Sequence, residues 1–213
     1  MNTLRRVAVI DCGTNTFNLR IVDVGACAGW IPVFGQRVPV KLGKGGVAKG
    51  IITADRMARG LDALIAMREA ARNYRVEDVH VLATSAMRDA KNGRDFVRKA
   101  KELADLDIQV ISGQHEARLI QEGIALNFPD TVEETCLTMD IGGGSVEFII
   151  WSKDGIQWVQ SFDTGVARLH MLMNLSDPIG AEGCLRMRPH FDETMAPLSC
   201  LLYTSDAADD RVS

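Results

Sequence analysis

The chain has 213 residues and a formal net charge of −4, with 46% hydrophobic and 24% charged residues, a composition that excludes whole-chain disorder, collagen and coiled coil. Its acidic balance argues against a general nucleic-acid binder, which would be basic overall, although a local cleft can still attract a polyanion. No apolar run reaches the roughly 18–20 residues that span a bilayer, so we expect a cytoplasmic protein that binds neither nucleic acid nor membrane.

The first half of the chain is expected to start with a hairpin and then to alternate helices with strands. Short apolar runs predict strands over residues 7–11, 17–24, 30–42, 79–83 and 108–111. Turn-compatible residues at 12–16 join the first two strands. Apolar residues with a 3.6-residue period predict three helices, which begin after Thr53, at Gly93 and after Ser112. Thr53 and Ser112 are expected to cap theirs.

The same order then restarts. Apolar runs predict strands over residues 136–140, 146–151 and 156–161. Three glycines at 142–144 form the turn between the first two of these strands, and a helix is expected over 166–173. Because a hairpin opens each half, we predict an α/β fold with mixed sheets.

The two hairpin turns are the main clue to function. Asp11-Cys-Gly-Thr-Asn-Thr16 and Asp140-Ile-Gly-Gly-Gly-Ser145 share the pattern Asp-x-Gly-x-x-(Thr/Ser), at an offset of 129 residues. A single turn of this kind is weak evidence, because Asp-Gly turns are common. Two matched copies predict two related domains, each of which directs a tight turn toward a shared cleft; the alternative is two plain hairpins with Asp caps.

The residue types in these turns suit a phosphate chain. Gly13 and the run Gly142, Gly143 and Gly144 allow backbone N–H groups to approach an anion closely. Hydroxyl and amide groups that would add hydrogen bonds belong to Thr14, Asn15, Thr16 and Ser145. Asp11 and Asp140 repel phosphate directly, but they can reach it through Mg²⁺, which takes carboxylate and phosphate oxygens.

Other ligand motifs are weaker. Residues 43–48 fit the loose dinucleotide pattern G-x-G-x-x-A, but no clear helix opens there, which favours a flexible loop. There is no P-loop, and the four histidines lack metal-ligand spacing. Arg37 and Lys41 could line the cleft or decorate an edge strand, and we leave both out of the predicted site.

Four stretches, together with Gly165–Leu169 and Phe191–Leu198, resemble the exopolyphosphatase/guanosine pentaphosphate phosphohydrolase family over residues 7–198. The four stretches are Val9–Leu19, Ala83–Arg88, Val110–Ile120 and Asp140–Glu147. That family belongs to the superfamily of acetate and sugar kinases, heat-shock chaperones and actin. The resemblance implies a ribonuclease H-like (actin-like ATPase) fold, with mixed sheets, flanking helices and two related domains.

The resemblance also implies an activity. It is the hydrolysis of a terminal phosphoanhydride of inorganic polyphosphate or guanosine pentaphosphate, which releases orthophosphate and uses Mg²⁺ or another divalent cation. Glu116 and Glu147 are implied as catalytic residues, Arg88 as a substrate contact, and Asp11, Asp140 and Glu147 as metal ligands. Two positions depart from the family motifs, because His115 replaces a glutamate and Val146 replaces a threonine.

The resemblance divides the chain. Residues 1–125 correspond to a first actin-like domain and residues 126–199 to part of a second, so we expect an incomplete second domain and a homodimer as the candidate assembly of the full-length protein. Residues 200–213 resemble a translated sequencing adapter and are expected to be an artefact. A chain cut in this way is a candidate for an inactive fragment.

Two other functions stay open. A sugar or acetate kinase-type phosphotransferase would share the fold, but the stretch Ser112–Ile120 is not expected in kinases. A non-enzymatic nucleotide-sensing module would not need Glu116 and Glu147. Each predicted site residue also has a plain structural reading: Glu116 can favour a helix start through the dipole, and Arg88 can be a surface charge. The sequence does not distinguish polyphosphate from guanosine pentaphosphate.

Overall fold

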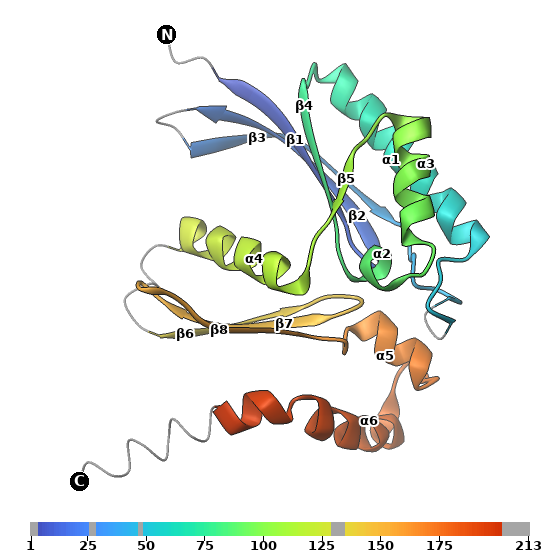
Figure 1. Ribbon diagram of the computed structural model, residues 1–213, viewed down its shortest axis with the longest axis vertical. Coiled ribbons are helices and arrows are strands. Elements are labelled where there is room, and N and C mark those ends of the chain that lie inside the picture. Colours follow the sequence, from blue (N-terminus) through green and yellow to red (C-terminus); the bar gives the residue numbers. More distant parts are fainter. Residues whose placement is uncertain (1–3, 26–28, 47–48, 129–134, 202–213) are drawn as a thin grey trace.

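The protein is described here by a computed structural model, which covers residues 4–25, 29–46, 49–128 and 135–201. Two sheets lie one above the other in Figure 1. The first sheet has the strand order β3-β2-β1-β4-β5 and the second the order β6-β7-β8. The strands of the first sheet are β1 (Arg5–Cys12), β2 (Thr16–Gly25), β3 (Gly29–Pro39), β4 (Asp78–Ala83) and β5 (Ile108–Val110).

The first sheet is mixed, as predicted. Strand β1 pairs with β2 in antiparallel and with β4 in parallel orientation. Alternate residues of β1, namely Ala8, Ile10 and Cys12, are fully buried because successive side chains of a strand point to opposite faces. The helices of this half are α1 (Ala54–Asn73), α2 (Ser85–Asp89), α3 (Gly93–Ala104) and α4 (Gly113–Asn127).

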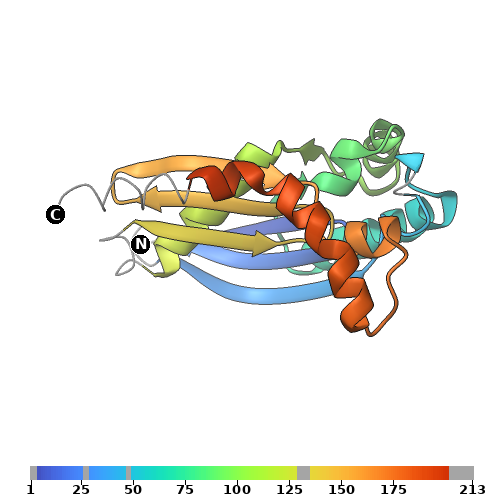
Figure 2. The ribbon, with the colours of Figure 1, turned by 90° about the horizontal axis from the view of Figure 1, so that it is seen from below.

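The second sheet has a helix on each face. Its elements are β6 (Cys136–Ile141), β7 (Val146–Ser152), β8 (Gly155–Phe162), α5 (Val166–Leu172) and α6 (Gly180–Thr194). Helix α4 lies on the face toward the first sheet, and α6 crosses the opposite face (Figures 1 and 2). Ala117 of α4 packs in one apolar cluster with Ile149 and Trp151 of β7. Helix α4 therefore joins the two sheets.

Strand β6 is an edge strand in the described part of the chain. It pairs only with β7, whereas β1, its counterpart in the repeat, lies between two strands. Its apolar residues Leu137, Met139 and Ile141 are each about half exposed, at 49%, 55% and 56%. The three side chains share one face because strand side chains alternate.

The two predicted hairpins have the same local structure. The N–H of Gly13 donates to Thr16 O at 3.1 Å, and the N–H of Gly142 donates to Ser145 O at 3.0 Å. The two hydrogen bonds join residues that differ by 129 at both ends. The internal repeat read from the sequence is therefore also a repeat of the backbone.

Several local expectations differ from the structure. Thr53 stands at the N-cap of α1, but its hydroxyl donates to Asp55 Oδ1 and makes no capping bond. The strand expected to reach residue 42 ends at Pro39, which has no N–H for the ladder. Leu103, expected on the apolar face of α3, is 59% exposed. Helix α6 was not predicted, because Gly183 and Pro189 interrupt its apolar period.

Other expectations stay predictions. Residues 42–46 of the predicted loop form turns, and residues 47–48 lie outside the described residues. Residues 196–201 form a further helical segment that includes the first two residues of the predicted tail, and residues 202–213 also lie outside the description. The division into residues 1–125 and 126–199 is not tested by this geometry. Within the described residues, no helix is long and apolar enough to cross a membrane.

Candidate active site

The two hairpin turns meet at a cavity of about 440 Å³. Its lining includes eleven of the predicted site residues, namely Asp11, Gly13, Thr14, Asn15, Thr16, Glu116, Asp140, Gly142, Gly143, Gly144 and Ser145. Below, the first turn means residues 13–16 and the second turn means residues 142–145. The cavity thus brings together segments 129 residues apart in the sequence and a residue from the start of α4.

The two turns are in close contact. A Cβ atom on Gly143 would lie 2.9 Å from the Asn15 amide nitrogen, and one on Gly144 would lie 2.5 Å from the Thr14 hydroxyl. Neither distance is compatible with a larger residue unless the turns separate. The glycines of the second turn are therefore required by this contact as well as by the bend of the hairpin.

Hydrogen bonds to α5 fix the orientation of the second turn. The carbonyls of Gly142 and Gly143 accept bonds of 2.9–3.0 Å from backbone N–H groups in the first turn of α5. In a planar trans peptide the N–H points opposite to the preceding C=O, so the N–H groups of Gly143 and Gly144 point away from α5. Neither has a hydrogen-bond acceptor among the described residues. Two adjacent free N–H groups in a glycine turn suit an anion.

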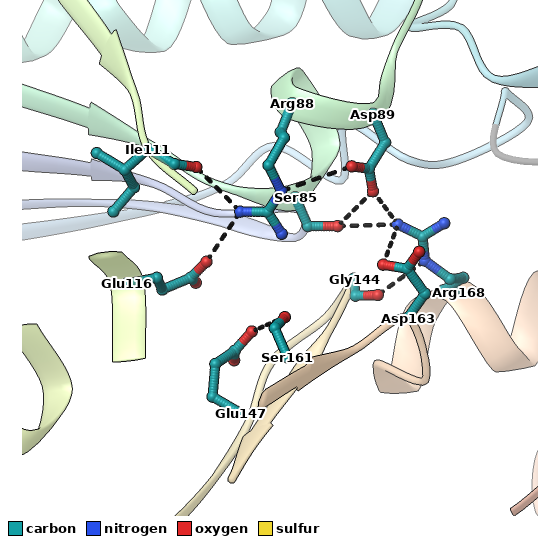
Figure 3. Close-up of polar contacts among 10 residues, drawn as sticks. All are labelled: Ser85, Arg88, Asp89, Ile111, Glu116, Gly144, Glu147, Ser161, Asp163 and Arg168. Atoms are coloured by element: carbon teal, nitrogen blue, oxygen red, sulfur yellow. Dashed lines mark hydrogen bonds and ion pairs between the residues drawn. The ribbon is translucent and has the colours of Figure 1, made fainter. Parts of the chain in front are cut away.

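Glu116 lies at the centre of the polar contacts in Figure 3. It projects from the first turn of α4, which Ser112 caps as predicted by accepting a hydrogen bond from the N–H of His115. Burial and the nearby charge of Glu147 raise the pKa of Glu116 to about 7, although Arg88 acts in the opposite direction. Arg88 Nη1 donates to Glu116 Oε2 at 3.2 Å and to Ile111 O at 3.1 Å.

Glu147 lies behind Glu116, on β7. It is only 1% exposed, and Ser161 Oγ donates to its Oε1 at 2.7 Å. Its other oxygen, Oε2, is buried without a hydrogen-bond partner. Burial raises the pKa of Glu147; the hydroxyls of Ser161 and Ser145 oppose this, whereas the charge of Asp140 adds to it. A buried carboxylate with one free oxygen is costly unless a cation or proton accompanies it.

Asp11 and Asp140 take equivalent places near the ends of β1 and β6. Loss of solvation raises the pKa of Asp11, the amide of Asn18 opposes this, and the charge of Asp140 raises it further. The charged side chains that line the cavity are three carboxylates and one guanidinium, that of Arg37. No group of three or more His, Cys, Asp or Glu side chains in the described residues is close enough to hold a metal ion on its own.

The cavity also contains residues that we did not predict. Arg37, which we left out of the site, lines it together with Asn18 and Ser85. Arg88 and Glu147 do not line it and reach it through Glu116. Ser161 and Arg168 were missed as well, because each acts on a partner that lies far away in the sequence. The only signal for Arg168 was its place in the family-like stretch Gly165–Leu169.

Comparison with known proteins identifies the family. Residues 21–204 match the model of the Ppx/GppA phosphatase family. The chain belongs to this family. A curated exopolyphosphatase-type protein of Haemophilus influenzae is 32% identical over 148 residues, which is 69% of this chain and 45% of that protein. The chain thus spans less than half of this Ppx/GppA relative.

Solved structures agree. The crystal structure of an exopolyphosphatase from Cytophaga hutchinsonii matches with a TM-score of 0.89 and 38% identity, over 94% of this chain and 64% of that one. The Ppx/GppA enzyme of Aquifex aeolicus matches with a TM-score of 0.73 and 24% identity, over 92% of this chain and 64% of that one, a likeness of fold alone. The predicted family and the actin-like fold with mixed sheets are confirmed.

The position of Glu116 in this Ppx/GppA site predicts a dependence of stability on pH. A carboxyl whose pKa is raised on folding binds more protons in the folded than in the unfolded state, so stability falls as pH rises between the two pKa values. For Glu116 that window runs from its ordinary value of 4.5 to about 7. We expect Glu116→Gln, compared with the wild type, to become progressively more stable across this window and to keep a constant gain above it.

Urea unfolding without divalent cations, repeated from pH 4.5 to 8, measures this difference. Glu122→Gln on the same helix is the matched control, because Glu122 is exposed. Its curve is expected to run parallel to that of the wild type. A stability difference between Glu116→Gln and the wild type that does not change with pH would contradict the raised pKa.

Proposed function

We propose that the protein of which this chain forms part hydrolyses the terminal phosphoanhydride of a phosphate chain, releases orthophosphate and uses Mg²⁺. The observation that carries the proposal is the cavity in which two equivalent turns lie beside one carboxylate, Glu116. Phosphoanhydride hydrolysis is mainly positioning and charge stabilisation. The side chains and free N–H groups of the two turns supply donors for the phosphate oxygens.

The acidic cavity supports a divalent cation. Three carboxylates and a single guanidinium would repel a polyphosphate, and the free oxygen of Glu147 lacks a partner. Mg²⁺ is usually held by one or two carboxylates plus substrate phosphates and waters, so it does not require the three-ligand group that the described residues lack. Asp11, Asp140 and Glu147 would hold it, and when bound it neutralises charge on the phosphates.

Glu116 is proposed as the general base. A base works best when its pKa lies near the working pH, and the pKa of Glu116 is about 7. Its carboxylate accepts a proton from a water molecule whose oxygen forms a bond to the terminal phosphorus. The bond from that phosphorus to the bridging oxygen breaks, and the electron pair stays on the shortened chain. Arg88 orients Glu116 through its 3.2 Å hydrogen bond.

Among the substrates we favour inorganic polyphosphate over guanosine pentaphosphate. No aromatic side chain lines the cavity within the described residues, so the cavity offers no surface for stacking a purine base. The solved relative from Cytophaga hutchinsonii is an exopolyphosphatase. A cytoplasmic location, a homodimer of the full-length protein and the two-domain division remain part of this proposal.

Titration calorimetry with tripolyphosphate and Mg²⁺ is the first test, and a colorimetric assay of orthophosphate release from polyphosphate is the second. We expect binding that requires both components, because the cavity alone is acidic. Binding of GTP or guanosine pentaphosphate in preference to tripolyphosphate would overturn the substrate choice. Phosphate transfer to added acetate or glucose, with hydrolysis unchanged, would instead favour a kinase.

A further inference from the structure

Arg168 of α5 joins the second turn to the first half of the chain (Figure 3). Its Nε donates to Gly144 O at 2.8 Å, and its Nη2 donates to Ser85 Oγ at 3.0 Å. The same Nη2 forms an ion pair with Asp89 of α2. The side chain is only 17% exposed. We call these four residues the Arg168 bridge.

The bridge acts directly on the peptide that carries a turn N–H group. Gly144 O accepts from Arg168 Nε and, at 3.3 Å, from the N–H of Gly165. Because the peptide unit is planar, fixing this carbonyl also fixes the direction of the Ser145 N–H. The guanidinium thus sets the orientation of one N–H group in the second turn while its other end is held by the first half.

The two halves are joined in a different way elsewhere. Helix α4 packs on β7 and β8 through an apolar cluster that includes Ala117, Ile149 and Trp151. In Figure 1 this helix lies along the sheet, whereas α2 and α5 face each other at the end where the turns meet. Apolar packing is non-directional, so it permits small shifts of one turn against the other. The Arg168 bridge is directional.

We propose that Arg168 is a positioning residue that holds the second turn at a fixed distance and orientation from the first, so that both turns grip one phosphate chain. The proposal rests on the proposed function, because it assumes that the turns bind phosphates. Arg168 touches no phosphate in this account. It acts through the Gly144 carbonyl and through Asp89.

The chemistry requires arginine. A guanidinium presents several N–H groups in a rigid planar fork, whereas an ammonium is a single point charge on a flexible stem. Arg168 uses Nε for Gly144 and Nη2 for Asp89 and Ser85. A lysine can keep the ion pair with Asp89, but it cannot also hold the carbonyl in the same geometry. Arg168→Lys therefore separates the charge from the fork.

The test uses Arg168→Lys with Arg98→Lys as its control. Arg98 is exposed and pairs with Glu102 one helical turn away on α3. For Arg168→Lys we expect an unfolding midpoint close to that of the wild type but about tenfold weaker binding of tripolyphosphate with Mg²⁺, equivalent to about 1.4 kcal/mol. We also expect shifted amide NMR signals of Gly144 and Ser145 without ligand. Arg98→Lys should change none of these.

Each outcome is decisive. Wild-type affinity of Arg168→Lys, or unshifted signals of Gly144 and Ser145, overturns the positioning role. If Arg168→Lys lowers the unfolding midpoint and leaves the affinity of the folded protein unchanged, the bridge is only structural and the proposal also fails. If the wild type itself does not bind tripolyphosphate, the proposed function fails, while the amide signals still report whether Arg168 orients the second turn.

Discussion

Glu116→Gln is expected to reduce orthophosphate release by about 10²–10⁴-fold, the usual contribution of a general base, without weakening the binding of tripolyphosphate. The amide oxygen of glutamine can still accept the hydrogen bond that Arg88 donates to Glu116 Oε2. The geometry of the cavity is therefore preserved, and only the capacity to take a proton is lost. Removing a negative charge from this acidic cavity also favours polyanion binding.

Orthophosphate release and calorimetric binding, measured on the same preparations, test this prediction. Glu122→Gln on the exposed side of α4 is the matched control and is expected to leave both quantities unchanged. If Glu116→Gln loses binding and keeps its rate per bound substrate, Glu116 holds the substrate and is not the base. If both quantities stay at the wild-type level, the assignment of the active site is wrong.

Gly165→Ala is expected to weaken tripolyphosphate binding by about 100-fold or more, equivalent to about 2.7 kcal/mol. A Cβ on Gly165 would lie 2.5 Å from the backbone of Gly143 and Gly144, and backbone atoms cannot move aside as a flexible side chain can. The backbone angles of Gly165, φ −62° and ψ 151°, are available to alanine. The effect is therefore purely steric and displaces the second turn.

Gly123→Ala provides the contrast. Gly123 lies inside α4, and a Cβ there would meet nothing within 4 Å, so this change is expected to stabilise the protein by about 0.5–1 kcal/mol. Calorimetry measures binding, and urea unfolding measures stability. Gly165→Ala with wild-type affinity would show that the second turn does not contact the ligand.

The features that the sequence predicts well are local. Both hairpins follow from apolar runs that flank glycine and threonine, since such patterns depend only on neighbouring residues. Ser112 caps α4 as expected for the same reason. The matched turns could be placed at a common cavity because the repeat itself implies equivalent positions. Local pattern and duplication therefore carried most of the fold and the core of the candidate site.

The features that it predicts poorly depend on distant partners. Arg168 binds Ser85, which is 83 residues away, and no spacing rule connects the two. The tie between Arg88 and Glu116 spans 28 residues, so an arginine expected to contact substrate is partly engaged by a carboxylate. Thr53 stands at a helix start, but Asp55 competes for its hydroxyl. Tertiary contacts decide all three cases.

The open edge of β6 has a practical consequence. Its backbone groups on that side are free to pair with another strand, and half-exposed apolar side chains accompany them. Unprotected edges of this kind are templates for association between chains. Concentrated solutions of this polypeptide should accordingly form oligomers, and affinities determined in dilute samples will describe the monomer.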